Sequence, residues 1–165
     1  LTVYGIKAHA SLPDLGVNAI LEAFSALDEA GMDDPAVRFM NRYFGTGCHG
    51  ERLGIDQHDD YGDLTLNVGV IKEENGLITG SIDIRYPVTK DPQQMKREFL
   101  KPSQDDPDGK IICHNVIAPL FFPPDSPLIK TLMEAYREVT GDLESLPMVI
   151  GGVFFLTGKW KNVKG

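Results

Sequence analysis

The feature that most constrains this fold is a pair of alternating runs on either side of Asn75-Gly76. Strict alternation of apolar with polar or small residues is typical of a strand with one buried face. Asn-Gly is the preferred centre of a two-residue hairpin turn. The sequence therefore predicts an antiparallel hairpin whose apolar face must be covered by other parts of the chain. The apolar residues fall at even positions: Leu64, Leu66, Val68 and Val70 before the turn, and Ile78, Ile82, Ile84 and Tyr86 after it.

Helical spacing of apolar residues flanks the hairpin. One helix is predicted from Val17 to Leu27, with Gly31 ending it, and a second from Pro35 to Phe44. Pro35 fits the first position of the second helix, so Asp34, directly before it, is predicted to be the residue that caps this helix. A third helix is predicted over residues 91–100. The stretch from 45 to 62 is polar and rich in glycine, which predicts a loop with a short helical turn.

Two further strands are predicted, over residues 1–9 and 111–122. The resulting order, β-α-(α)-β-β-α-β, is that of the ferredoxin-like split βαβ arrangement. We therefore expect an α+β fold with an antiparallel sheet and helices on one of its faces.

Pro123-Pro124-Asp125 marks a predicted boundary between residues 1–122 and residues 123–165. Ser126 can cap a helix that has Pro127 at its first position and Gly141 at its end. A short strand over 147–150 is predicted to follow.

The composition excludes some classes of partner. The net charge of −8 argues against nucleic acid, whose phosphates require clustered Lys and Arg. No apolar run approaches the ~20 residues of a membrane span. Cys48 and Cys113 form no CxxC pair, and two reduced thiols are typical of a cytoplasmic protein.

Four motifs, in this order, resemble one family. They are Ala8-His9-Ala10-Ser11 with Leu15–Ile20, the strand Leu64–Ile71, Asp83-Ile84-Arg85-Tyr86-Pro87, and Pro127–Met133 running to Asp142. They resemble the Xaa-His (carnosinase-like, PepV-like) zinc dipeptidases, within the superfamily of aminoacylase, ArgE, DapE and carboxypeptidase G. The resemblance implies that residues 1–122 are a lid domain, which could lack its beginning. It also implies that residues 123–165 are a returning piece of the zinc catalytic domain.

The resemblance implies roles for four residues. His9 would stabilise the oxyanion of the tetrahedral intermediate when the lid closes. Arg85 would bind the substrate carboxylate through its planar guanidinium. Gly151 and Gly152 would offer backbone groups to substrate, although the likeness stops after Gly152. From the residues alone, His9 can equally be a hydrogen-bonded histidine at a strand end, and Arg85 part of a surface ion pair.

The resemblance also implies two zinc ions whose ligands are not in this chain. No His-x-Asp followed by Glu-Glu is present, and His58-Asp59-Asp60 fits only the letters. We expect the isolated chain to be inactive, and its partners to be the catalytic domain of the same protein and a dipeptide substrate. We expect Cys48, His49 and His58 to be solvated loop residues rather than metal ligands, and His114 to be a packed or edge-strand histidine.

Two alternatives stay open. The chain could be a non-catalytic dimerisation or interaction module that forms a homodimer through the lid. It could also be the lid of a deacylase that acts on N-acyl amino acids.

Overall fold

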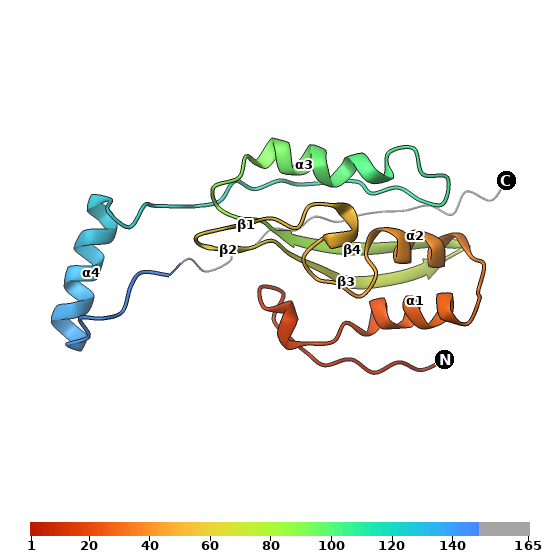
Figure 1. Cartoon of the computed structure of the whole chain (residues 1–165), viewed down its shortest axis with the longest axis horizontal. Helices are drawn as coiled ribbons and strands as arrows, with labels where there is room; N and C mark the ends of the chain where they lie inside the picture. The colour runs from red at the N-terminus through yellow and green to blue at the C-terminus, as the bar shows by residue number, and fades with distance from the viewer. Residues whose placement is uncertain (149–165) are drawn as a thin grey trace.

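The computed structural model describes residues 1–148 and has an α+β fold (Figure 1). Its centre is the predicted hairpin, in which β3 (Thr65–Glu74) pairs antiparallel with β4 (Leu77–Arg85). Asn75 and Gly76 have φ angles of 56° and 77°, as a type I′ turn requires. The hairpin prediction is therefore confirmed, and the register places Leu66 opposite Ile84.

Three helices share one core with the even-numbered face of this hairpin. They are α1 (Ala19–Glu29), α2 (Pro35–Tyr43) and α3 (Pro92–Leu100). Asp34 caps α2 through the backbone N–H of Ala36, as predicted. The core takes side chains from every one of these elements: Leu21, Phe39, Met40, Leu66, Val68, Ile82, Ile84, Met95 and Phe99. Helices on one face of an antiparallel hairpin are compatible with the predicted split βαβ arrangement.

The two outer strands of that prediction are wrong as strands. Within residues 1–9 only Ile6 makes a β-bridge, and its partner is Val17 rather than the hairpin. Residues 111–122 run without a ladder (Figure 1), although Ile111 is buried and the hydroxyl of Tyr86 donates to the carbonyl of Ile117 at 2.9 Å. These segments contain residues that favour strands, but a strand also needs a neighbouring strand to pair with, and the residue types alone do not determine that neighbour.

The segment between α2 and β3 has more structure than expected. The predicted helical turn is present as the 3-10 turn η2 (Glu51–Leu53). A small hairpin follows it, made of two strands of two residues each, β1 (His58–Asp59) and β2 (Gly62–Asp63). The sequence did not indicate this hairpin. The carboxylate of Asp59 accepts from the backbone N–H and the hydroxyl of Thr89, so this small hairpin is attached to the turn between β4 and α3.

The helix α4 (Pro127–Thr140) begins at Ser126 and ends at Gly141, whose φ is 72°, as predicted. It buries none of its residues and stands away from the rest of the molecule (Figure 1). Leu128, Leu132 and Val139 are 48%, 57% and 86% exposed. Most of its apolar stripe is therefore uncovered within residues 1–148, although Ile129 lines a small pocket with Tyr61 and Phe121.

No helix in this part of the chain combines the length and the apolar character needed to cross a membrane. The predicted strand over 147–150 reaches beyond the described residues, and Pro147 and Met148 are not in a strand.

Candidate functional site

His9 lies on a loop that is closed by a pair of backbone hydrogen bonds. The N–H of Ile6 donates to the carbonyl of Val17 at 3.0 Å, and the N–H of Val17 donates back at 2.9 Å. A Cβ at Gly16 would come within 2.6 Å of the carbonyl oxygen of Ile6, so only glycine allows this approach. The 3-10 turn η1 (Pro13–Leu15) lies inside the loop.

The hydrogen bonds of His9 define its tautomer. Its Nδ1 accepts the backbone N–H of Ser11 at 3.3 Å and lies 2.7 Å from the Ser11 hydroxyl. A nitrogen that accepts an N–H carries no proton, so in the neutral ring Nε2 is the donor. The imidazole is exposed, which leaves this donor available to an incoming group.

Arg85 lies on the odd-numbered face of β4, as the alternation predicts, but this face is not solvated. Arg85 is 9% exposed and pairs with Asp83 at 3.6 Å. The loop that carries His9 covers the neighbouring position, where the Thr65 hydroxyl donates to the carbonyl of Ala10 at 3.4 Å. The prediction of an ion pair at Arg85 is therefore confirmed, but the prediction that this pair lies on a solvated surface is wrong.

Asp83 connects the two predicted site residues electrostatically. Burial raises the pKa of its carboxyl, and the charges of Arg85 and His9 oppose that rise. One oxygen of Asp83, Oδ1, is buried and has no hydrogen-bond partner among the described residues. His9 and Arg85 therefore lie on the same side of the hairpin, with a carboxylate that interacts with both.

A cavity of about 380 Å³ opens between the His9 loop, α1 and β3. His9, Asp14, Asn18, Cys48 and Asn67 are among its lining residues, whereas Arg85 is not. The structure thus brings His9 to a cavity and leaves Arg85 beside it. Such concave, partly polar sites are the usual places for small ligands.

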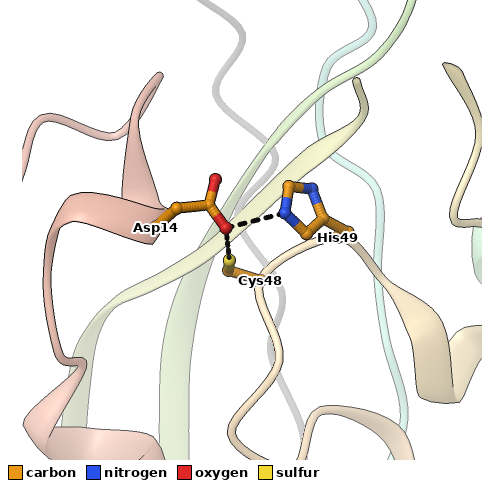
Figure 2. Close-up of side chains that lie close together, drawn as sticks. All are labelled: Asp14, Cys48 and His49. Carbon is orange, nitrogen blue, oxygen red and sulfur yellow. Dashed lines mark hydrogen bonds and ion pairs between the residues drawn. The ribbon is translucent and has the colours of Figure 1, made fainter.

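A cluster that the sequence analysis missed lies at the edge of this cavity (Figure 2). The carboxylate of Asp14 lies 3.2 Å from Sγ of Cys48 and 2.8 Å from Nε2 of His49. These bonds lower the pKa of Asp14. The backbone carbonyl of Leu64 is the main cause of the raised pKa of His49. Burial, followed by Asp14, raises the pKa of the Cys48 thiol to about 12.

The expectation that Cys48 and His49 are solvated is therefore wrong. Adjacent side chains converge here because the loop turns sharply, with Gly50 at a φ of 77°. No signal in the sequence joins Asp14 to residues more than thirty positions later.

The remaining candidates lie apart from this site. His58 is exposed in β1, and His114 is exposed in the extended segment after α3. Neither belongs to a group of potential metal ligands within residues 1–148. Gly151 and Gly152 lie outside the described residues, so their predicted contacts with substrate stay a prediction.

Comparison with known proteins supplies the family. Residues 1–106 match the family described as the peptidase dimerisation domain of M20 peptidases. The chain is 34% identical over 164 residues to the putative dipeptidase YtjP of Bacillus subtilis (strain 168), covering 93% of this chain and 34% of that protein. It is 35% identical over 162 residues to the putative dipeptidase SH1171 of Staphylococcus haemolyticus (strain JCSC1435), covering 92% of this chain and 33% of that protein.

The chain thus spans about a third of the length of the curated relatives it matches. The matched region, residues 1–106, includes both His9 and Arg85. On this evidence the chain belongs to the M20 peptidase family and carries its dimerisation domain.

Proposed function

We propose that this chain is the lid of a zinc-dependent dipeptidase, in which His9 stabilises the oxyanion formed during peptide hydrolysis. The observation that carries the proposal is the orientation of His9. Its Nδ1 is held by Ser11, so that an exposed Nε2–H is presented at a cavity. A fixed N–H directed at developing negative charge lowers the barrier to acyl transfer. The names of the relatives support the substrate class.

Arg85 is proposed to bind the carboxylate of the substrate, which would select a free C-terminus. Asp83 holds the guanidinium from one side, and a guanidinium presents enough donors to bind a second carboxylate. Because Arg85 does not line the cavity, this role requires the catalytic domain to complete the site when the lid closes. Xaa-His dipeptides are the proposed substrates, with N-acyl amino acids as the alternative.

The zinc ions of this proposal belong to the rest of the protein. A di-zinc peptidase site is built from His and several carboxylates. Within residues 1–148 the only group of potential ligands is Asp14, Cys48 and His49, which has one carboxylate and one thiol. This set does not fit a two-ion hydrolytic site, so we derive no catalytic step from it.

The exposed stripe of α4 fits a returning segment of the catalytic domain. A row of apolar side chains that is largely exposed needs another surface to bury it. In this proposal α4 packs on the catalytic domain and thereby ties the lid to it.

The test uses the whole protein that contains this chain. Kinetics on a panel of dipeptides and N-acyl amino acids should show a fall in kcat of about 10²–10³-fold for His9→Ala, as for other oxyanion donors. Arg85→Lys should raise KM for dipeptides, because it keeps the charge and loses the planar fork. Normal turnover by a folded His9→Ala protein would overturn the role of His9.

A homodimer through the lid is a second candidate. It is favoured by the family description and by the hairpin, because β3 and β4 pair only with each other among residues 1–148. Unpaired strand edges are ready to pair with another chain. Light scattering over a concentration series should then give twice the chain mass, and a monomer throughout would exclude this candidate.

A further inference from the structure

We propose that Asp14, Cys48 and His49 form a binding site for one Zn²⁺ ion, separate from any catalytic ions of the whole protein. One potential ligand atom from each residue lies within 4.8 Å of the others (Figure 2). Asp14 comes from the His9 loop, whereas the other two residues come from the loop between α2 and η2. The proposal rests on these residues and not on the proposed hydrolytic function.

Two hydrogen bonds hold the Cys48-His49 loop in place, one to Leu66 in β3 and one to Leu64 directly before this strand. The N–H of Leu66 donates to the carbonyl of Cys48 at 2.7 Å, and Nδ1 of His49 lies 2.7 Å from the carbonyl of Leu64. A carbonyl only accepts, so Nδ1 carries the proton of this bond. In a neutral ring Nε2 then presents its lone pair. A histidine whose other ring nitrogen donates to a backbone carbonyl is the usual arrangement of a metal ligand.

The partner of Nε2 is also an acceptor. Nε2 faces the carboxylate of Asp14 at 2.8 Å, so two electron-rich atoms meet at a distance that requires a cation or a proton between them. The thiol of Cys48 reaches the same carboxylate oxygen at 3.2 Å. The carboxylate of Glu51 accepts from the backbone N–H of His49 at 3.1 Å and adds a further negative charge nearby. This environment favours a cation.

The donor set selects zinc. Thiolate, imidazole and carboxylate are its common protein ligands, so the Cys48 thiol would release its proton to solvent when the ion binds, and sites with three protein ligands leave one position open. With metal–ligand bonds of about 2.0–2.3 Å, tetrahedral ligands lie about 3.3–3.6 Å apart. The Asp14 oxygen must therefore move about half an ångström away from Nε2 of His49 and slightly less from Sγ of Cys48, while those two atoms, which lie within 4.8 Å of each other, must settle at the same ligand spacing. The Asp14 side chain is 60% exposed and can make this movement.

Occupation of the site would attach the His9 loop to the body of the domain. Asp14 is in η1, inside the loop closed at Ile6 and Val17, whereas Cys48 is bonded to β3. Zinc would thus replace a cluster of hydrogen bonds with a cross-link and hold the loop against the hairpin.

The test is titration of the metal-free 165-residue chain with Zn²⁺ by calorimetry, and with Co²⁺ by absorption spectroscopy. We expect one ion per chain and a thiolate-to-cobalt charge-transfer band. Cys48→Ser should abolish the band and weaken Zn²⁺ binding on the order of 100-fold or more, since even changes outside the ligand set cost 10–100-fold. Serine can still donate to Asp14, so this variant keeps the hydrogen bond while removing the thiolate.

Matched controls separate this site from the other His and Cys residues. Cys113→Ser and His58→Gln should bind like the parent chain, and Asp14→Asn should bind weakly while folding normally because Asp14 is exposed. Zn²⁺ should raise the melting temperature of the parent but not of Cys48→Ser. Absence of binding by the folded parent, or equal binding by folded Cys48→Ser and Asp14→Asn, would overturn the proposal and leave the cluster as a hydrogen-bonded tether.

Discussion

Asn18 is the residue whose replacement tests most directly how the His9 loop is joined to the hairpin. Its side-chain oxygen accepts from the backbone N–H groups of Ile20 and Leu21 at 3.0 and 3.4 Å, which caps α1. Its side-chain nitrogen donates to Oδ1 of Asn67 and to the carbonyl of Val68, each at 3.0 Å. One amide thus caps a helix and bonds it to β3.

The expected cost of Asn18→Ala follows from these bonds. Loss of the cap costs about 1 kcal/mol. Each of the two bonds to β3 contributes about 0.5–1.5 kcal/mol. We therefore expect the free energy of unfolding to fall by about 2–4 kcal/mol, a large part of the 5–15 kcal/mol typical of a domain.

Asn18→Ser separates the two contributions. A serine hydroxyl can cap α1 but is too short to reach β3, so only the loss of the two β3 bonds remains, about 1–3 kcal/mol. The assay is urea unfolding followed by far-ultraviolet circular dichroism, with linear extrapolation. A loss below about 0.5 kcal/mol for Asn18→Ala, the range of a neutral surface change, would refute the reasoning.

Three further changes test other parts of the molecule. The hydrogen bonds from Arg38 lower the pKa of Asp108 and outweigh burial, which alone would raise it. The stability that this carboxylate contributes is therefore present above its unfolded pKa and is lost as the pH falls through the lower, folded pKa. The difference in unfolding free energy between the parent and Asp108→Asn should therefore be full at pH 7 and shrink below about pH 4, and a constant difference would contradict this. Gly16→Ala should displace the His9 loop, because its Cβ would meet the Ile6 carbonyl at 2.6 Å, and unchanged loop amide shifts in NMR spectra would argue against this. Leu132→Ser should leave the stability of the isolated chain within about 0.5 kcal/mol, as at other exposed positions, and a larger loss on thermal unfolding would mean that α4 is packed.

Local chemistry made much of the fold predictable. Asn75-Gly76 fixes a turn by itself, and Pro35, Pro92 and Pro127 each fall in the first turn of the helix predicted for them. These signals act within a few residues, so they survive without knowledge of the tertiary structure. The α+β class followed from them directly.

Features that depend on distant partners were not predictable in the same way. The extended stretch 111–122 has strand-forming residues but makes no ladder, because pairing depends on which edge it meets. The backbone N–H of Ile111 instead donates to the hydroxyl oxygen of Ser103 at 3.2 Å. For the same reason neither the bond from Asn18 to β3 nor the meeting of Asp14 with Cys48 could be inferred from spacing.

The bridge between Ile6 and Val17 has a consequence for how this domain can be re-engineered. The loop closes on itself at these two residues, and Gly5, directly before it, packs against the bridge, since a Cβ at Gly5 would come within 2.5 Å of the Val17 carbonyl oxygen. An exchange of the segment from Ile6 to Val17 between related lids would therefore have to keep glycine at positions 5 and 16, where any side chain would push the two halves of the bridge apart.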